Sequence, residues 1–202
     1  ILACAIGLSV GIIRFFSQED GWICQDGQWV RHGNPDLPVP TASCPGDEKT
    51  LPQSKTMMIT SPAFSDMDNI PLVYTCDGRG ISPPLVISGV SEGIESLALI
   101  LSDPDAPSGT FYHWLVWNIV PDTREIPEGS APDGSAEGIN SGNTVGYVAP
   151  CPPTGSHRYV FMLYALDTSL ILPAKTSAQE LFQAMDGHIV EFARVTGMYV
   201  RL

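Results

Sequence analysis

Short apolar runs separated by proline and glycine are the feature of this 202-residue chain that most restricts its fold. The chain holds 18 prolines and 19 glycines, which gather between the apolar runs. This spacing favours strands joined by many turns over a helical bundle. Because hydrophobic residues make up 44% of the sequence and charged residues 16%, most of the chain is expected to fold. We therefore predict a mainly β, antiparallel domain.

The run 96–101 is apolar on both faces and too short for a core helix, so it predicts a central buried strand. Its end brings Asp103 to the surface of a predicted cavity. Residues 113–119 predict another strand, and strict alternation places four of its side chains on one face: His113, Leu115, Trp117 and Ile119. A later strand carries His157, Tyr159, Phe161 and Leu163 on one face and Arg158 on the other. If the two strands are neighbours, both imidazoles converge beside Tyr159.

Further elements complete the predicted domain. Residues 57–61 and 71–74 are candidate strands, and 85–87 follows two prolines as an edge or entry strand. Residues 121–144 lack apolar periodicity and predict an irregular acidic surface loop without the register of a calcium loop. Ser177 and Glu180 form a capping-box pattern that begins a helix ending at Gly187. Residues 195–200 favour a closing strand.

The N-terminal quarter differs in composition from the rest. Residues 1–16 are a predicted hydrophobic anchor or the remnant of a signal segment, because residues 1–13 carry no charge but fall short of the about 20 residues that span a bilayer. A buried element of the globular domain is the alternative. Residues 17–55 read as a small appendage and linker with a hairpin that turns at Asp26 and Gly27. Cys24 and Cys44 either form a disulfide there or remain free thiols in a tethering linker.

The charge balance excludes one class of partner. Ten basic residues stand against 22 acidic ones, which gives a formal net charge of −12. Such a surface repels phosphate backbones, and no basic stripe offsets it. We expect no nucleic-acid binding, and any anionic ligand has to be held by local donors.

Four motifs in order carry a family resemblance. They are D-P-D-A-P at 103–107, H-W-L-V-W-N-I at 113–119, P-C-P-P-T-G-S-H-R-Y-V-F from residue 150, and G-H-I at 187–189. Together with T-C-D-G at 75–78, they resemble the phosphatidylethanolamine-binding protein family in its prokaryotic, Raf kinase inhibitor-like branch. The resemblance covers residues 57–202, so we place the domain at 56–202. It implies an antiparallel β-sandwich with a large central sheet, a smaller sheet and one or two C-terminal helices.

The resemblance also implies a pocket for small anions. Its predicted ligand-binding residues are Asp103, His113, Cys151, Pro152, Pro153, His157 and Tyr159. Histidine and tyrosine supply hydrogen-bond donors, and backbone N–H groups of the glycine- and proline-rich loop can complete an anion-binding hollow. Ionised Asp103 cannot donate, so we expect it to orient a histidine, while Asp105 braces the turn and Arg158 forms a structural ion pair.

Two rival interpretations use the same residues. Cys151 with His113 or His157 as base would make a hydrolase, although Cys76 and Cys151 can instead form a disulfide in an exported protein. Asp103, His113 and His157 could alternatively ligate a metal. We predict a binding protein that is not an enzyme and needs no cofactor or metal. Its partners would be a small anionic or phosphorylated ligand, such as a phospholipid head group, or a protein docked at the pocket mouth. We also expect the globular domain to lie outside the cytoplasm, membrane-anchored or secreted, and to act as a protease- or kinase-inhibitor-like regulator.

Overall fold

The computed structural model describes residues 21–25, 28–32, 56–173 and 175–201. The chain divides into two compact units, residues 1–53 and 54–202, and each is described by itself. The predicted anchor at 1–16 lies outside the described residues. Among the described residues, no helix has the length and apolar character needed to cross a membrane.

The first unit contains two short strands, β1 (Gly21–Gln25) and β2 (Gln28–His32). They pair antiparallel, with Cys24 opposite Trp29, as the predicted hairpin requires. The turn residues 26 and 27 are outside the described part of the chain, and so is Cys44. A Cys24–Cys44 disulfide therefore stays a prediction.

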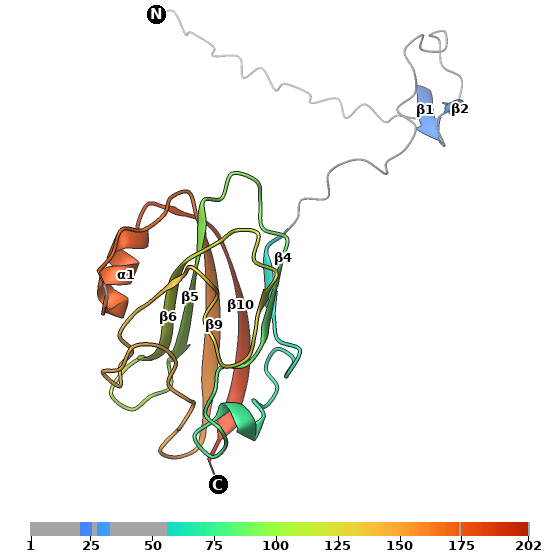
Figure 1. Cartoon of the computed structure of the whole chain (residues 1–202). Coiled ribbons are helices and arrows are strands. Elements are labelled where there is room, and N and C mark those ends of the chain that lie inside the picture. The colour runs from blue at the N-terminus through green and yellow to red at the C-terminus, as the bar shows by residue number, and fades with distance from the viewer. Residues whose placement is uncertain (1–20, 26–27, 33–55, 174, 202) are drawn as a thin grey trace, which may run out of the picture. The chain divides into compact units, whose positions relative to one another are not determined.

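Two antiparallel sheets form the second unit (Figure 1). In spatial order, the larger sheet consists of β10 (Ile189–Val200), β9 (Ser156–Leu166), β5 (Ser96–Asp103), β6 (Phe111–Ile119) and β8 (Ala136–Glu137). The smaller sheet consists of β3 (Met58–Thr60), β4 (Leu85–Ser88) and β7 (Glu125–Ile126). The predicted mainly β fold with one large and one small sheet is confirmed. So is the central position of the strand that begins at Ser96.

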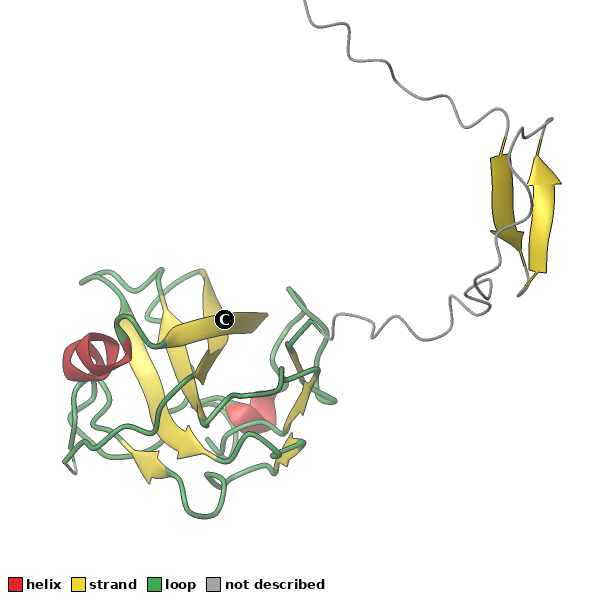
Figure 2. Ribbon diagram, turned by 90° about the horizontal axis from the view of Figure 1, so that it is seen from above, coloured by secondary structure: helices red, strands yellow, loops and turns green. Residues whose placement is uncertain are grey.

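Both faces of the five-stranded sheet are covered, which explains why residues 97–101 of β5 are all apolar and buried (Figure 2). Leu97, Leu99 and Leu101 pack toward the three-stranded sheet, in one core with Leu85 and Phe161. The alternate residues Ala98 and Ile100 pack in a second core with Leu181 and Met185 of the single described α-helix. A strand buried on both sides has no need of polar alternation.

That helix, α1 (Ala178–Met185), begins as the capping box predicts. The Ser177 hydroxyl accepts from the Glu180 backbone N–H, and the Glu180 carboxylate accepts from the Ser177 backbone N–H. Asp186 is the C-cap, and Gly187 follows with a φ of +79°, a conformation that glycine adopts without strain. The structure therefore contains one of the one or two predicted C-terminal helices.

The predicted faces of β6 are correct for residues 114–117 and wrong at both ends, because the strand carries two irregularities. Leu101 and Ser102 of β5 oppose Trp114 and Tyr112, so His113 is an extra residue at that point. Near the other end, Asn118 has a φ of +56°, where the register shifts again. A bulge of this kind inserts one residue and re-aims the side chains beyond it. As a result, Leu115 and Trp117 face α1, whereas Trp114, Val116 and Ile119 face the smaller sheet.

Three other expectations need correction. Residues 71–74 do not form a strand, because Leu72–Tyr74 is a turn of 3₁₀-helix in which the Thr75 N–H donates to the Leu72 carbonyl. The strand after the two prolines is not an edge strand, since β4 lies between β3 and β7. The predicted loop 121–144 contains β7 and β8, which extend the smaller and the larger sheet respectively. Its two strand pairs have two residues each, too few to produce a periodic pattern.

Candidate functional site

A cavity of about 310 Å³ opens where β5 ends and β6 begins. The turn after β5 forms one wall, and the segment 148–153 forms another. Its lining comprises Asp103, Ala106, Pro107, Ser108, Gly109, Phe111, His113, Val148, Ala149, Cys151 and Pro153. Two of these residues, Asp103 and His113, are ionisable and more than nine-tenths buried, so the polar chemistry of the cavity is concentrated in them.

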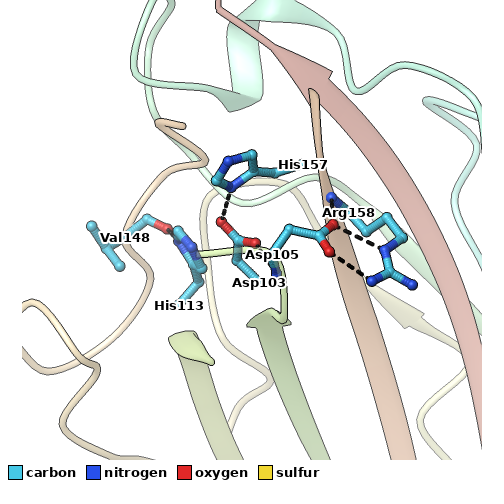
Figure 3. Close-up of polar contacts among 6 residues, drawn as sticks. All are labelled: Asp103, Asp105, His113, Val148, His157 and Arg158. Atoms are coloured by element: carbon cyan, nitrogen blue, oxygen red, sulfur yellow. Dashed lines mark hydrogen bonds and ion pairs between the residues drawn. The ribbon is translucent and has the colours of Figure 1, made fainter. Parts of the chain in front are cut away.

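Asp103 is the last residue of β5, and both its carboxylate oxygens are used (Figure 3). Oδ2 accepts a hydrogen bond from Nδ1–H of His157 at 2.7 Å. Oδ1 accepts from the backbone N–H of Asp105 at 2.9 Å, which fixes the turn that follows. The carboxylate therefore orients His157 and braces its own loop, which is the role that we expected of it.

His113 reaches the cavity because of the bulge in β6. On a regular strand it would oppose Ser102 and face away from Asp103. With the extra residue, its ring lies on the side of Tyr159, at a centroid distance of 5.3 Å in an edge-to-face arrangement. Its Nδ1–H donates to the Val148 carbonyl at 2.8 Å. Burial lowers the pKa of His113 from its ordinary value, although the Val148 carbonyl and the Asp103 charge oppose this shift.

His157 and Tyr159 lie behind the cavity lining, on β9. The two histidine strands are not neighbours, since β5 lies between them, yet Asp103 of β5 connects to His157 directly. Tyr159 is fully buried, and among the described residues its hydroxyl is the one buried side-chain polar atom without a hydrogen-bond partner. Burial, and secondarily the Asp103 charge, raises the pKa of Tyr159, so its hydroxyl keeps its proton.

Arg158 lies on the opposite side of β9 from its two neighbours, as alternation predicts, and binds Asp105 (Figure 3). Nε and Nη2 of Arg158 reach the two Asp105 oxygens at 2.9 and 2.6 Å, and the Arg158 backbone N–H adds a third bond at 2.9 Å. These bonds lower the pKa of the Asp105 carboxyl to about 2. The pair joins the turn after β5 to β9 and leaves the cavity to Asp103 and His113.

Cys76 and Cys151 meet beside the cavity. Their sulfur atoms are placed as in a disulfide, and their Cα atoms are 5.4 Å apart, within the range that such a bond requires. In this arrangement Cys151 has no free thiol to act as a nucleophile. Its sulfur also lies 3.7 Å from Nη1 of Arg201, an exposed contact near the C-terminus.

Of the seven predicted ligand-binding residues, Asp103, His113, Cys151 and Pro153 line the cavity, and Pro152, His157 and Tyr159 do not. Sequence reasoning missed Phe111, Val148 and the loop 106–109 as lining. Ala106 and Pro107 belong to the motif that begins at Asp103, so their place could have been inferred. Val148 contributes a backbone carbonyl, for which the sequence holds no signal.

The metal interpretation gains no support from the geometry. Within the described ranges, no three or more histidine, cysteine, aspartate or glutamate side chains are grouped so as to hold a metal ion. Both Nδ1 atoms of the paired histidines are already bonded, His113 to a carbonyl and His157 to a carboxylate.

A larger cavity of about 530 Å³ lies between residues 57–66 and β10. Its ionisable side chains, Asp66 and Arg194, are both exposed, and Asp66 already accepts from the Thr196 backbone N–H at 2.8 Å. By volume alone, this larger cavity would be the candidate ligand site. We favour the smaller cavity, because its lining contains buried ionisable side chains that are held in fixed orientations.

Comparisons with known proteins agree with the fold described above. A family model described as phosphatidylethanolamine-binding protein matches residues 60–200. The chain belongs to this family. Its members are in general binding proteins without enzymatic activity that take small ligands or partners.

Relatives and solved structures match about three quarters of the chain. A UPF0098 protein of Methanothermobacter thermautotrophicus is 48% identical over 150 residues, which are 72% of this chain and 99% of the relative. The crystal structure of a phosphatidylethanolamine-binding protein homolog from Chlamydia trachomatis is 41% identical, with a TM-score of 0.71 over 74% of this chain and all of the other. Escherichia coli YbcL is 27% identical, with a TM-score of 0.68 over 72% of this chain and 99% of its own.

Proposed function

We propose that this protein is a non-enzymatic binding protein that holds a small oxyanion of the phosphate type in the cavity at the end of β5. The observation that carries the proposal is the pairing of two nine-tenths buried ionisable residues, Asp103 and His113, in the wall of one cavity. Buried ionisable groups are costly unless they serve a structural pair or a ligand. Asp103 has such a pair in His157, whereas His113 has only a carbonyl on one of its two ring nitrogens.

The size of the cavity limits the ligand. A volume of about 310 Å³ is at the lower end of the range for small-molecule sites. It suits a phosphate group with a short substituent better than a lipid chain. The candidate ligands are therefore a phospholipid head group, a phosphorylated small molecule or a phosphorylated side chain of a partner protein at the cavity mouth. Inhibition of a protease or kinase through such docking remains part of the proposal.

The other predicted ligand-binding residues lie behind the cavity lining or form part of its wall. Tyr159 supplies an unpartnered hydroxyl behind His113, and His157 is held by Asp103. Pro153 and Cys151 shape the wall. The rival hydrolase would need Cys151 as a thiolate, and the position of the Cys76 sulfur argues against it.

A location outside the cytoplasm is the compartment that we propose. A disulfide between Cys76 and Cys151 would be stable in an oxidising compartment and reduced in the cytosol. The apolar residues 1–13 would suit export or anchoring. Mass spectrometry of the isolated protein, with and without reductant, tests the pairing.

Calorimetric titration tests the binding site. Inorganic phosphate and phosphoethanolamine are titrated into the unaltered protein, His113→Ala and His188→Ala. His188 serves as the control because its Nδ1, like that of His113, is held by one oxygen acceptor, here the Asp167 carboxylate, but at the exposed surface and away from the cavity. We expect binding to be lost in His113→Ala and kept in His188→Ala. Equal affinity in all three proteins would show that the anions do not bind at His113 in this cavity.

A further inference from the structure

The two buried ionisable side chains of the cavity offer no free hydrogen-bond donor to an anion. A carbonyl oxygen can only accept, so Nδ1 of His113 carries the hydrogen in its bond to Val148. A neutral imidazole has one N–H, and here it is committed. Nε2 of His113 then presents a lone pair, and no partner for it exists among the described residues. The neighbouring Asp103 carboxylate also offers only acceptors.

Only part of the backbone of the lining can donate. Pro107 and Pro153 have no N–H. The N–H of Gly109 donates to the Ala106 carbonyl at 3.1 Å, and the N–H of Val148 donates to the His113 carbonyl at 2.9 Å. The exposed hydroxyl of Ser108 and the backbone N–H groups of Ala106, Ser108, Ala149 and Cys151, for which the described residues provide no acceptor, remain as donors at the rim. At the two buried ionisable groups, however, a fully ionised anion would face a carboxylate and a ring lone pair.

We propose that the cavity binds an oxyanion only together with one proton, held between the anion and Nε2 of His113. Phosphate and phosphomonoesters in their hydrogen-bearing monoanionic form are the preferred ligand class, because they bring that proton with them. Sulfate has no proton near neutral pH and must acquire one from solvent through the imidazole. The inference rests on the proposed function, since it specifies which anions the same cavity accepts.

The groups around His113 set the direction of the pH dependence. Asp103 faces it from β5, and Tyr159 faces it from β9, with His157 reached through Asp103. The Phe111 ring lies at a centroid distance of 4.7 Å, and the Asp105–Arg158 pair is one turn further out. Burial keeps the free ring neutral by lowering its pKa. A bound anion adds negative charge beside the ring and raises that pKa again.

Sulfate affinity should consequently rise as the pH falls. Between the lowered pKa of the free ring and the raised pKa of the bound ring, each pH unit gives about a tenfold change in the dissociation constant. Below the pKa of the free ring the dependence levels off, because the ring is then protonated before binding. Below about pH 6 a phosphomonoester is still largely the hydrogen-bearing monoanion and supplies the proton itself, so its affinity should change little with pH there. Above its second pKa the dianion must take up a proton, and the affinity should then fall as the pH rises, as for sulfate.

Titration calorimetry with sulfate and with inorganic phosphate, from about pH 5 to about pH 8, tests the proposal. Each titration is run in two buffers of different ionisation enthalpy, which counts the protons taken up. We expect one proton per sulfate near neutral pH. His113→Gln should lose the proton uptake and the pH slope, whereas His188→Gln should keep both, with thermal unfolding measured to confirm that each variant is folded.

The outcomes separate the two proposals. Sulfate binding without proton uptake and with a constant dissociation constant overturns the proton-coupled mechanism and leaves anion binding intact. Proton uptake that persists in His113→Gln overturns the assignment to this ring. If neither anion binds at any pH while the protein is folded, anion binding itself is refuted.

Discussion

Two histidine–aspartate pairs of nearly the same length lie in different surroundings in this molecule. His157 and Asp103 are 2.7 Å apart, with side chains 8% and 5% exposed. His188 and Asp167 are 2.8 Å apart, with side chains 47% and 55% exposed. Both aspartates lie at or just beyond a strand end, Asp103 closing β5 and Asp167 following β9. The chemistry of the two pairs is the same and their environments are not.

The difference in exposure explains why only the buried pair can influence the groups of a binding site. Water screens the exposed pair, and holding two mobile side chains together offsets most of its attraction. The buried pair has lost its hydration, so each member depends on the other. A buried, oriented carboxylate at a cavity can hold a neighbouring imidazole in one state, whereas an exposed one has no such influence.

Removal of each aspartate should give the largest contrast. Asp103→Ala leaves His157 buried without its partner and frees the Asp105 backbone N–H, so we expect a loss of about 3–5 kcal/mol in the free energy of unfolding. Asp167→Ala should cost less than about 1 kcal/mol. Urea denaturation of both variants measures the two values. Equal losses would mean that burial does not distinguish the pairs.

Loss of the Cys76–Cys151 bond should have the next largest effect. The two residues are 75 positions apart, so closing this loop restricts the unfolded chain strongly. We expect Cys76→Ser/Cys151→Ser to lower the free energy of unfolding of the second unit by about 2–4 kcal/mol. Cys24→Ser/Cys44→Ser is the control, since Cys24 and Cys44 lie in the first unit. A reducing agent that leaves the stability of the unaltered protein unchanged would show that the bond does not form.

The Asp105–Arg158 pair is intermediate in exposure and should have the smallest effect. The pKa of Asp105 falls from 3.8 to about 2 on folding, mainly through its bonds to Arg158. A depressed carboxyl pKa stabilises the fold above the unfolded-state value, and this contribution disappears as the pH falls from about 4 to about 2. Because the pair is partly exposed, we expect only about 0.5–1 kcal/mol. Unfolding of Asp105→Asn and of the unaltered protein should differ at neutral pH and converge at the acid end.

The sequence was sufficient for the parts of the fold that repeat a pattern. The apolar run from Ser96, the alternating β9 strand and the capping box at Ser177 were each predicted correctly, because each depends on local periodicity or on one local hydrogen-bond pattern. The 3₁₀ turn at Leu72–Tyr74 was missed since an apolar triplet fits either conformation. The two-residue strands β7 and β8 were missed because pairing with distant partners defines them.

The sequence predicted several residues of the site but not how they are arranged. Motifs identified Asp103, His113 and Cys151, all of which line the cavity. They gave no sign of the bulge that turns His113 toward Asp103, and strict alternation placed the ring on the wrong face. They also could not show that the Val148 carbonyl takes the only N–H of the neutral ring. In our proposal that bond decides which anions the cavity can accept, and it arises from backbone that is far from His113 in sequence.

Nitrogen-15 NMR of the histidine rings during a phosphate titration tests the central claim most directly. We expect phosphate to shift the Nε2 resonance of His113 in a saturable manner and to raise the pKa of its ring. The resonances of His188, whose Nδ1 binds the Asp167 carboxylate at the exposed surface, should not move at the same phosphate concentration. Saturable shifts at His188 with none at His113, or no saturation at either ring, would contradict the assignment of the cavity as an oxyanion site.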